Sequence, residues 1–101
     1  MIIDSLAVVI PCYNVGSLYG KVIEKTFCCV PHIVAIDDGS TDATPKVLEA
    51  SGAEVITHPQ NRGKGAALRT GFQYLLQAGD WSAVATMDGD GQHDPALLGI
   101  L

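Results

Sequence analysis

The chain has few cysteines, few basic residues and no long apolar run, and each shortage argues against a class of protein. Its three cysteines include no C-x-x-C pair, so we expect neither a disulfide framework nor a zinc ribbon, and a reducing, cytoplasmic setting fits best. Six basic residues against eleven acidic ones give a net charge of −5, which argues against non-specific binding to nucleic acid. The apolar runs fall far short of the roughly 20 residues of a membrane span, and no signal-peptide pattern opens the sequence.

What the chain does contain is an alternation of apolar runs and amphipathic segments over 101 residues, which suits a single domain. The apolar runs predict four strands, at residues 6–11, 32–37, 53–58 and 82–87. Runs without a polar face are typical of strands that are covered on both sides. Strands separated by helices predict an α/β fold, with a parallel sheet of four strands and helices on both faces.

Helical spacing of apolar residues predicts three helices between these strands. They span residues 17–28, a segment that opens with Thr41 or Asp42 as N-cap and ends at Gly52, and residues 64–78. The expected buried stripe of the last helix is Leu68, Phe72, Leu75 and Leu76. A further helical turn is expected to open at Pro95.

Unusual polar residues follow three of the four predicted strands, in residues 11–14, 37–40 and 88–93. The carboxyl ends of parallel strands meet at one edge of a sheet, and ligands of such sheets bind beyond that edge. Six of the eleven carboxylates form two clusters, which are Asp37, Asp38 and Asp42, then Asp88, Asp90 and Asp94. Carboxylates gathered on turns point to a cation, a sugar hydroxyl or both.

The pair Asp88 and Asp90 is the candidate metal site. In an extended segment, residues two apart project to the same side, so their carboxylates converge and favour a cation between them. Mg²⁺ or Mn²⁺ takes such ligands together with waters and phosphate oxygens. Gln92 and His93 are candidate additional contacts. The alternative is an Asp-Gly turn without a metal, which the position after a buried strand disfavours.

A second candidate site lies after the strand at residues 32–37. Asp38 is expected to accept hydrogen bonds from a base edge or from ribose hydroxyls, whereas Asp37 orients the turn. Tyr13 either stacks on a nucleobase or simply packs. Lys64, in a Gly-rich basic stretch at a helix start, either offsets the charge of a diphosphate or belongs to a solvated loop. His58 is interpreted as structural.

Four motifs together resemble the inverting family-2 glycosyltransferases, which have the Rossmann-like GT-A nucleotide-diphospho-sugar transferase fold. The motifs are Val8-Val-Ile-Pro-Cys-Tyr-Asn14, Ile36-Asp-Asp-Gly-Ser-Thr-Asp42, Asn61-Arg-Gly-Lys-Gly-Ala-Ala-Leu68 with Gly71, and Asp88-Gly-Asp-Gly-Gln-His-Asp-Pro95. The last two are most similar to the branch that includes dolichyl-phosphate mannose and glucose synthases.

The resemblance implies a site for a UDP- or GDP-linked sugar. The residues that would contact the nucleotide are Pro11, Tyr13, Asp38, Lys64 and Asp88. Asp88 and Asp90 would hold Mg²⁺ or Mn²⁺, with Gln92 close by. The sugar would pass with inversion to an acceptor, for which the resemblance suggests a polyprenyl phosphate at the cytoplasmic face of a membrane.

Family members extend well beyond the metal motif. Residues 1–101 are therefore expected to be the amino-terminal, nucleotide-sugar-binding part of a truncated transferase domain, with the catalytic base beyond Leu101. The strand before the metal motif would then lack a neighbour, and such an open edge favours association of copies. In this interpretation the isolated chain binds the donor without completing the transfer.

Two other functions stay open. An aspartate-nucleophile phosphatase would use the first carboxylate of Asp88-x-Asp90 to attack a phosphate, although such motifs normally follow the first strand. A non-catalytic domain would only bind a nucleotide or mediate assembly. Nucleotide binding that is indifferent to metal would count against the donor-site interpretation.

Overall fold

Four strands and three helices alternate through the part of the chain that the structure describes, in the predicted order. The computed structural model describes residues 6–28, 30–79, 81 and 83–87. The elements are β1 (Leu6–Cys12), α1 (Leu18–Phe27), β2 (His32–Asp37), α2 (Thr44–Ala50), β3 (Glu54–Thr57), α3 (Lys64–Ala78) and β4 (Ala83–Thr86). Within these ranges, no helix has the length and apolarity that crossing a membrane requires. The turn predicted at Pro95 lies outside them.

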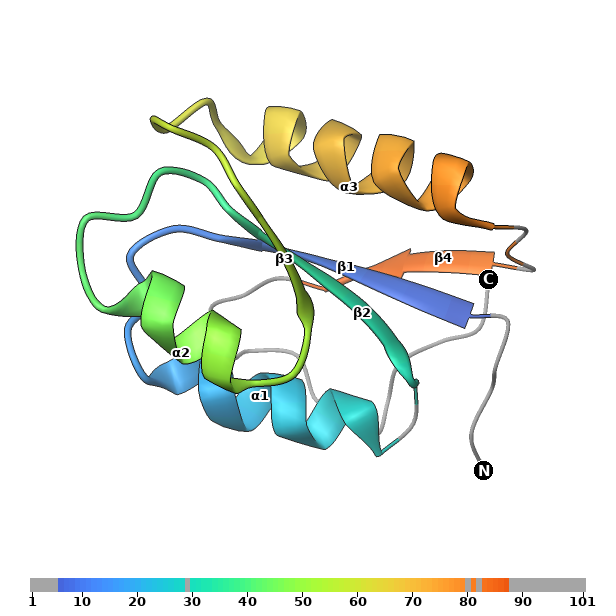
Figure 1. The fold of residues 1–101 in the computed structure, drawn as a ribbon, viewed down its shortest axis with the longest axis horizontal. Helices are drawn as coiled ribbons and strands as arrows, with labels where there is room; N and C mark the ends of the chain where they lie inside the picture. Colours follow the sequence, from blue (N-terminus) through green and yellow to red (C-terminus); the bar gives the residue numbers. More distant parts are fainter. Residues whose placement is uncertain (1–5, 29, 80, 82, 88–101) are drawn as a thin grey trace.

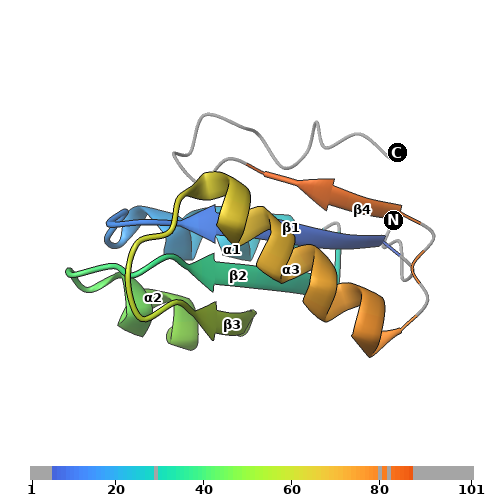
Figure 2. The ribbon, with the colours of Figure 1, turned by 90° about the horizontal axis from the view of Figure 1, so that it is seen from above.

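The strands form one parallel sheet in the order β3-β2-β1-β4 (Figure 2). The chain steps outward from β1 to β2 and β3, and then returns to the other side of β1 to form β4. The strand order therefore reverses between β1 and β4. In sheets of this kind, such a reversal marks the crevice in which ligands bind, at the carboxyl ends of the strands.

Helices cover both faces of the sheet, with α1 and α2 on one face and α3 on the other (Figure 1). Along β1, Val8 and Ile10 pack with side chains of α1 and α2, whereas Ala7 and Val9 pack with side chains of α3. Alternate side chains of a strand point to opposite faces of the sheet, and helices cover both faces here. Both sets of β1 side chains are therefore apolar, which makes β1 an unbroken apolar run. The predicted α/β fold is therefore confirmed.

The strand β1 runs through Pro11 to Cys12, although we expected the proline to stop it. The Val9 carbonyl points toward β4 and accepts a hydrogen bond from the Met87 amide, at 3.1 Å. The backbone nitrogen of Pro11, two residues further along β1, points to the same side. The pairing of β1 with β4 ends at Val9. The missing amide hydrogen of Pro11 therefore removes no bond from the ladder between the described strands.

The helix α2 begins later than predicted, at Thr44, with Pro45 in its first turn. The expectation that Thr41 or Asp42 is its N-cap is wrong, because the N-cap is Ala43 and no side-chain hydrogen bond caps the helix. The Thr41 amide donates to Asn14 Oδ1, at 2.8 Å. The Asp42 carboxylate still serves the start of the helix, since its Oδ1 accepts the Thr44 amide at 2.9 Å.

Three of the four residues in the predicted stripe of α3 pack against the core, namely Leu68, Phe72 and Leu75. Leu75 is buried and Phe72 is half-buried, as expected, but Leu76 is 79% exposed. The remaining buried positions of the helix are Ala66, Ala67 and Gly71. The pattern of large apolar side chains therefore finds most of the stripe but omits the small residues at which this helix lies close to the sheet.

Candidate functional site

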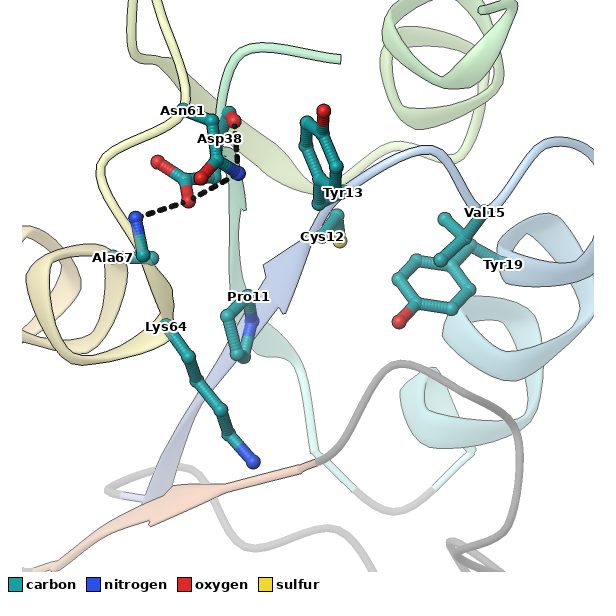
Figure 3. A pocket seen from close by; sticks show the side chains of 10 residues that line it. Pro11, Cys12, Tyr13, Val15, Tyr19, Asp38, Asn61, Lys64 and Ala67 are labelled. Atoms are coloured by element: carbon teal, nitrogen blue, oxygen red, sulfur yellow. Dashed lines mark hydrogen bonds between the residues drawn. The ribbon is translucent and has the colours of Figure 1, made fainter.

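A pocket of about 530 Å³ lies at the carboxyl ends of β1 and β2, beside the start of α3 (Figure 3). Its lining residues are Pro11, Cys12, Tyr13, Val15, Tyr19, Asp38, Asn61, Gly63, Lys64 and Ala67. The fold thus brings four of the predicted site residues, from segments far apart in the sequence, to one pocket. Tyr13 is 47% exposed, so much of its ring is accessible to a ligand.

Asp38 links the end of β2 to the loop before α3. Its Oδ1 accepts hydrogen bonds from His58 Nδ1 at 2.7 Å and from the Arg62 amide at 3.0 Å. Its Oδ2 accepts from Asn61 Nδ2 at 3.1 Å and from the Gly63 amide at 2.8 Å. These bonds use the roughly four acceptor positions of a carboxylate. A ligand can therefore bond to this carboxylate only by displacing one of the present donors, and the Asn61 contact is the longest.

Asp38 is 3% exposed, and its carboxyl group nevertheless has a lowered pKa. Burial raises the pKa of this carboxyl group. The hydrogen bonds from His58 and from the Arg62 and Gly63 amides, together with the electrostatic attraction of His58, outweigh that effect and hold the pKa below its ordinary value. At neutral pH, Asp38 is therefore a carboxylate that only accepts hydrogen bonds.

A second set of hydrogen bonds joins the loop after β1 to the loop after β2. Asn14 has φ +51°, which asparagine tolerates, and its backbone amide donates to Ser40 Oγ at 3.0 Å. The buried Thr44 Oγ1 accepts two amides of the first loop, from Val15 at 3.0 Å and from Gly16 at 2.9 Å. The loop that presents the exposed tyrosine is thereby fixed to the start of α2.

Asp37 orients the turn after β2, as expected, because its Oδ1 accepts the Ser40 amide at 3.0 Å. Its Oδ2 is buried and has no hydrogen-bond partner among the residues that the structure describes. Cys12 lies opposite Asp37 in the sheet, and burial, followed by the charge of Asp37, raises the pKa of the Cys12 thiol. Cys12 therefore stays protonated at neutral pH and forms part of the pocket wall rather than a nucleophile.

The predicted metal site lies outside the described residues, as Asp88, Asp90, Gln92 and His93 all do. Across residues 6–28, 30–79, 81 and 83–87, the structure has no group of three or more His, Cys, Asp or Glu side chains placed to hold a metal ion. The metal therefore stays a prediction that depends on Asp88 and Asp90.

Two residues at the pocket have more important contacts than the sequence indicates. The sequence favours a structural role for His58, but its ring is hydrogen-bonded directly to Asp38, to which the Asn61 side chain also donates. The sequence feature that could have indicated this contact is the position of His58 directly after an apolar strand, which places it at the same sheet edge as Asp38. The pairing of Asp37 with Thr57 brings the two side chains together, and that register is not visible in either segment alone.

Comparison with known proteins identifies the family of the chain. The model of the family described as "Glycosyl transferase family 2" matches residues 7–101. The polyprenol monophosphomannose synthase of Mycolicibacterium smegmatis is 31% identical over 102 residues, which cover 93% of this chain and 38% of that protein. The dodecaprenyl-phosphate galacturonate synthase of Rhizobium johnstonii is 31% identical over 102 residues, which cover 89% of this chain and 29% of that protein. The chain therefore spans well under half the length of these relatives.

A solved structure gives the same result. The glucosyl-3-phosphoglycerate synthase of Mycobacterium tuberculosis, in complex with Mn²⁺, UDP and glucosyl-3-phosphoglycerate, matches with a TM-score of 0.67 and 29% identity, over 85% of this chain and 33% of that one. These matches support the glycosyltransferase interpretation and not the phosphatase alternative. The chain belongs to glycosyl transferase family 2.

Proposed function

We propose that this chain forms the donor-binding part of an inverting glycosyltransferase that uses a UDP- or GDP-linked sugar. The observation that carries the proposal is the pocket at the ends of β1 and β2, because Pro11, Tyr13, Asp38 and Lys64 line it together. The pocket lies where ligands of parallel α/β sheets bind. Its volume of about 530 Å³ falls within the range of roughly 300–1,000 Å³ that is usual for small-molecule sites.

The lining residues offer contacts suited to a nucleoside diphosphate. The accessible ring of Tyr13 offers a surface on which a base can stack. Lys64 is the first residue of α3, where its cationic side chain and the positive end of the helix both favour an anionic diphosphate. Asp38 would accept a hydrogen bond from the base or ribose in exchange for its contact with the Asn61 amide.

The proposal assigns Mg²⁺ or Mn²⁺ to Asp88 and Asp90, with Gln92 and His93 as further contacts and Asp88 also near the nucleotide. Two carboxylates completed by phosphate oxygens are a ligand set that these ions take. A bound ion supplies positive charge that stabilises the departing nucleoside diphosphate. The M. tuberculosis neighbour, which was crystallised with Mn²⁺ and UDP, supports the use of a divalent metal.

The acceptor assigned by the proposal is a polyprenyl phosphate at the cytoplasmic face of a membrane, in keeping with the names of the two relatives. A phosphate oxygen is already ionised, so it needs less help from a catalytic base, which we place beyond Leu101 in the full transferase domain. The proposal also includes association of copies through β4, which lies at one edge of the described sheet.

Isothermal titration calorimetry of this chain with UDP and with GDP tests the proposal. We expect Mn²⁺-dependent binding that weakens at least about tenfold in EDTA or in the double variant Asp88→Asn, Asp90→Asn. Lys64→Ala should weaken the binding of UDP or GDP but not of the bare nucleoside. Lys25→Ala, which removes the same charge from the last turn of α1, should change neither. A folded chain that binds no nucleotide, or binds equally well in EDTA, would overturn the proposal.

A further inference from the structure

His58 is a buried polar residue that the proposed function does not use. It is 5% exposed and directly follows β3, and its amide donates to the Asp37 carbonyl at 2.8 Å. Both ring nitrogens have partners, since Nδ1 lies 2.7 Å from Asp38 Oδ1 and Nε2 lies 2.8 Å from Thr70 Oγ1. The ring therefore bridges the carboxyl end of β2 and the middle of α3.

The chemistry of its partners determines which ring nitrogen carries a hydrogen. A carboxylate has no hydrogen to donate, so Nδ1 must donate to Asp38. On the other side, Thr70 Oγ1 is 2.8 Å from Nε2 and 3.0 Å from the Ala66 carbonyl. The hydroxyl can donate to a neutral ring, or accept from a protonated ring while donating to Ala66. The Nδ1–H bond to Asp38 therefore persists in both charge states of the ring.

The Asp38 carboxylate, to which His58 donates, also accepts hydrogen bonds from the loop before α3. The other three donors to Asp38 are the Asn61 side chain and the Arg62 and Gly63 amides, all within this loop. The loop leads directly into Lys64, and both Asn61 and Lys64 line the pocket. A shift of the Asp38 carboxylate would therefore release the Arg62 and Gly63 amides together, whereas Asn61 Nδ2 would keep its hydrogen bond to the Asp38 carbonyl, at 3.2 Å.

We infer that His58 is a positioning residue of the pocket, which fixes Asp38 between β2 and α3 so that the loop of residues 59–63 is held in place for ligand binding. The effect of His58 on this loop can be tested without a nucleotide. Its consequence for nucleotide affinity rests on the proposed function.

The unliganded chain gives the first test, by amide hydrogen exchange and imidazole ¹⁵N NMR. We expect His58 in the Nδ1–H form. His58→Ala should speed exchange at Arg62 and Gly63 at least about tenfold while leaving β1 unchanged, because a hydrogen bond to a charged group is lost. In His58→Asn, the side-chain amide can replace Nδ1 as donor to Asp38, so protection should largely return. Thr70→Val keeps the bond to Asp38 and should have a smaller effect than His58→Ala.

Nucleotide affinity gives the second test. Binding of UDP or GDP in Mn²⁺ should weaken at least about tenfold in His58→Ala and recover in His58→Asn. Unchanged exchange at Arg62 and Gly63 in a folded His58→Ala chain, or an unprotonated Nδ1 in the native chain, would overturn the inference. If His58→Ala does not fold, loss of protection in a folded His58→Asn chain would likewise count against it, and retained protection would support it. Should the native chain bind no nucleotide, the proposed function fails, while the exchange data still decide the role of His58.

Discussion

Gly39 allows the turn after β2 and the loop before α3 to touch. Its φ is +78°, a conformation that residues with a side chain rarely adopt. A Cβ atom at this position would overlap the backbone of Gln60 and Asn61, with Gln60 Cα 2.8 Å away. The loop that closes on Asp38 therefore occupies space that only a glycine leaves free.

We expect Gly39→Ala to lower the free energy of unfolding by at least about 2 kcal/mol, because left-handed strain and backbone overlap add together. Gly52→Ala is the matched control, since Gly52 has φ +89° but its Cβ would meet only Phe27 Cε2, at 3.9 Å. The control should lose about 1 kcal/mol from strain alone. Urea unfolding followed by circular dichroism measures both variants. Equal losses would show that the backbone of Gln60 and Asn61 moves away from the new methyl group without lowering the free energy of unfolding.

At the scale of single residues, the sequence predicts chemical type better than hydrogen-bonding partners. Asp38 can be selected because it follows a buried strand and precedes a turn glycine, and it does line the pocket. Its principal partner, His58, cannot be inferred in the same way. The contact depends on the register of β2 against β3, and an unbroken apolar run such as β2 has no alternation that would specify a register.

At the scale of elements, α3 lies close to β1 at Gly71. A Cβ atom on Gly71 of α3 would lie 2.5 Å from Val9 Cγ1, and Val9 is fully buried. The helix therefore rests on the strand at a distance that excludes a methyl group. Since α3 carries Lys64 at its first turn, this contact helps to determine where that side chain meets the pocket.

Gly71→Ala is expected to destabilise the chain by about 1–3 kcal/mol, because the core around Val9 has no room for another methyl group. Gly65→Ala in the same helix is the control, since its Cβ would meet only Arg69 Nη1, at 3.6 Å. That variant should gain up to about 1 kcal/mol from helix propensity. Thermal and urea unfolding would compare the two. A gain in both variants would mean that Val9 moves aside freely and that the close approach is no constraint.

Most elements can be predicted from the sequence, and the boundaries that fail do so because of long-range contacts. The start of α3 at Lys64 is correct, since a glycine-rich loop and a periodic helix meet there. The predicted start of α2 is too early, because Thr41 and Asp42 are residue types that commonly cap helices and nothing in their own segment argues against that role. In the folded chain, Thr41 lies in a loop whose amide donates to Asn14, 27 residues away, and the helix begins at Thr44 with Ala43 as its N-cap.

At the scale of the whole molecule, the alternation of strands and helices is enough to predict a parallel α/β sheet and its ligand-binding edge. The presence of Pro11, Tyr13, Asp38 and Lys64 in one pocket agrees with that rule. The shape of the pocket cannot be predicted in this way. It depends on bonds between loops, such as those of Thr44 with the loop after β1, which form only once the strands are in register.

Stability in acid is another property of the whole fold that a pocket residue should influence. The pKa of Asp38 in the folded chain is lowered, whereas an unfolded aspartate has a pKa of about 4. A carboxyl group whose pKa is lower in the folded state stabilises the fold above the unfolded pKa. That contribution is lost as the pH falls through the folded pKa. The chain should therefore lose part of its stability below about pH 4 for this reason.

We expect the difference in unfolding free energy between the native chain and Asp38→Asn to be largest near neutral pH and to shrink as the pH falls below about 4. Asp42→Asn is the control, because the pKa of Asp42 is also lowered, by its hydrogen bonds with Thr44, but its side chain is exposed and screened by solvent. The pH-dependent part of its difference should therefore be smaller. Urea titrations between about pH 3 and pH 7 measure both differences. A difference for Asp38→Asn that keeps its size in acid would mean that the loop before α3 does not depend on the charge of Asp38.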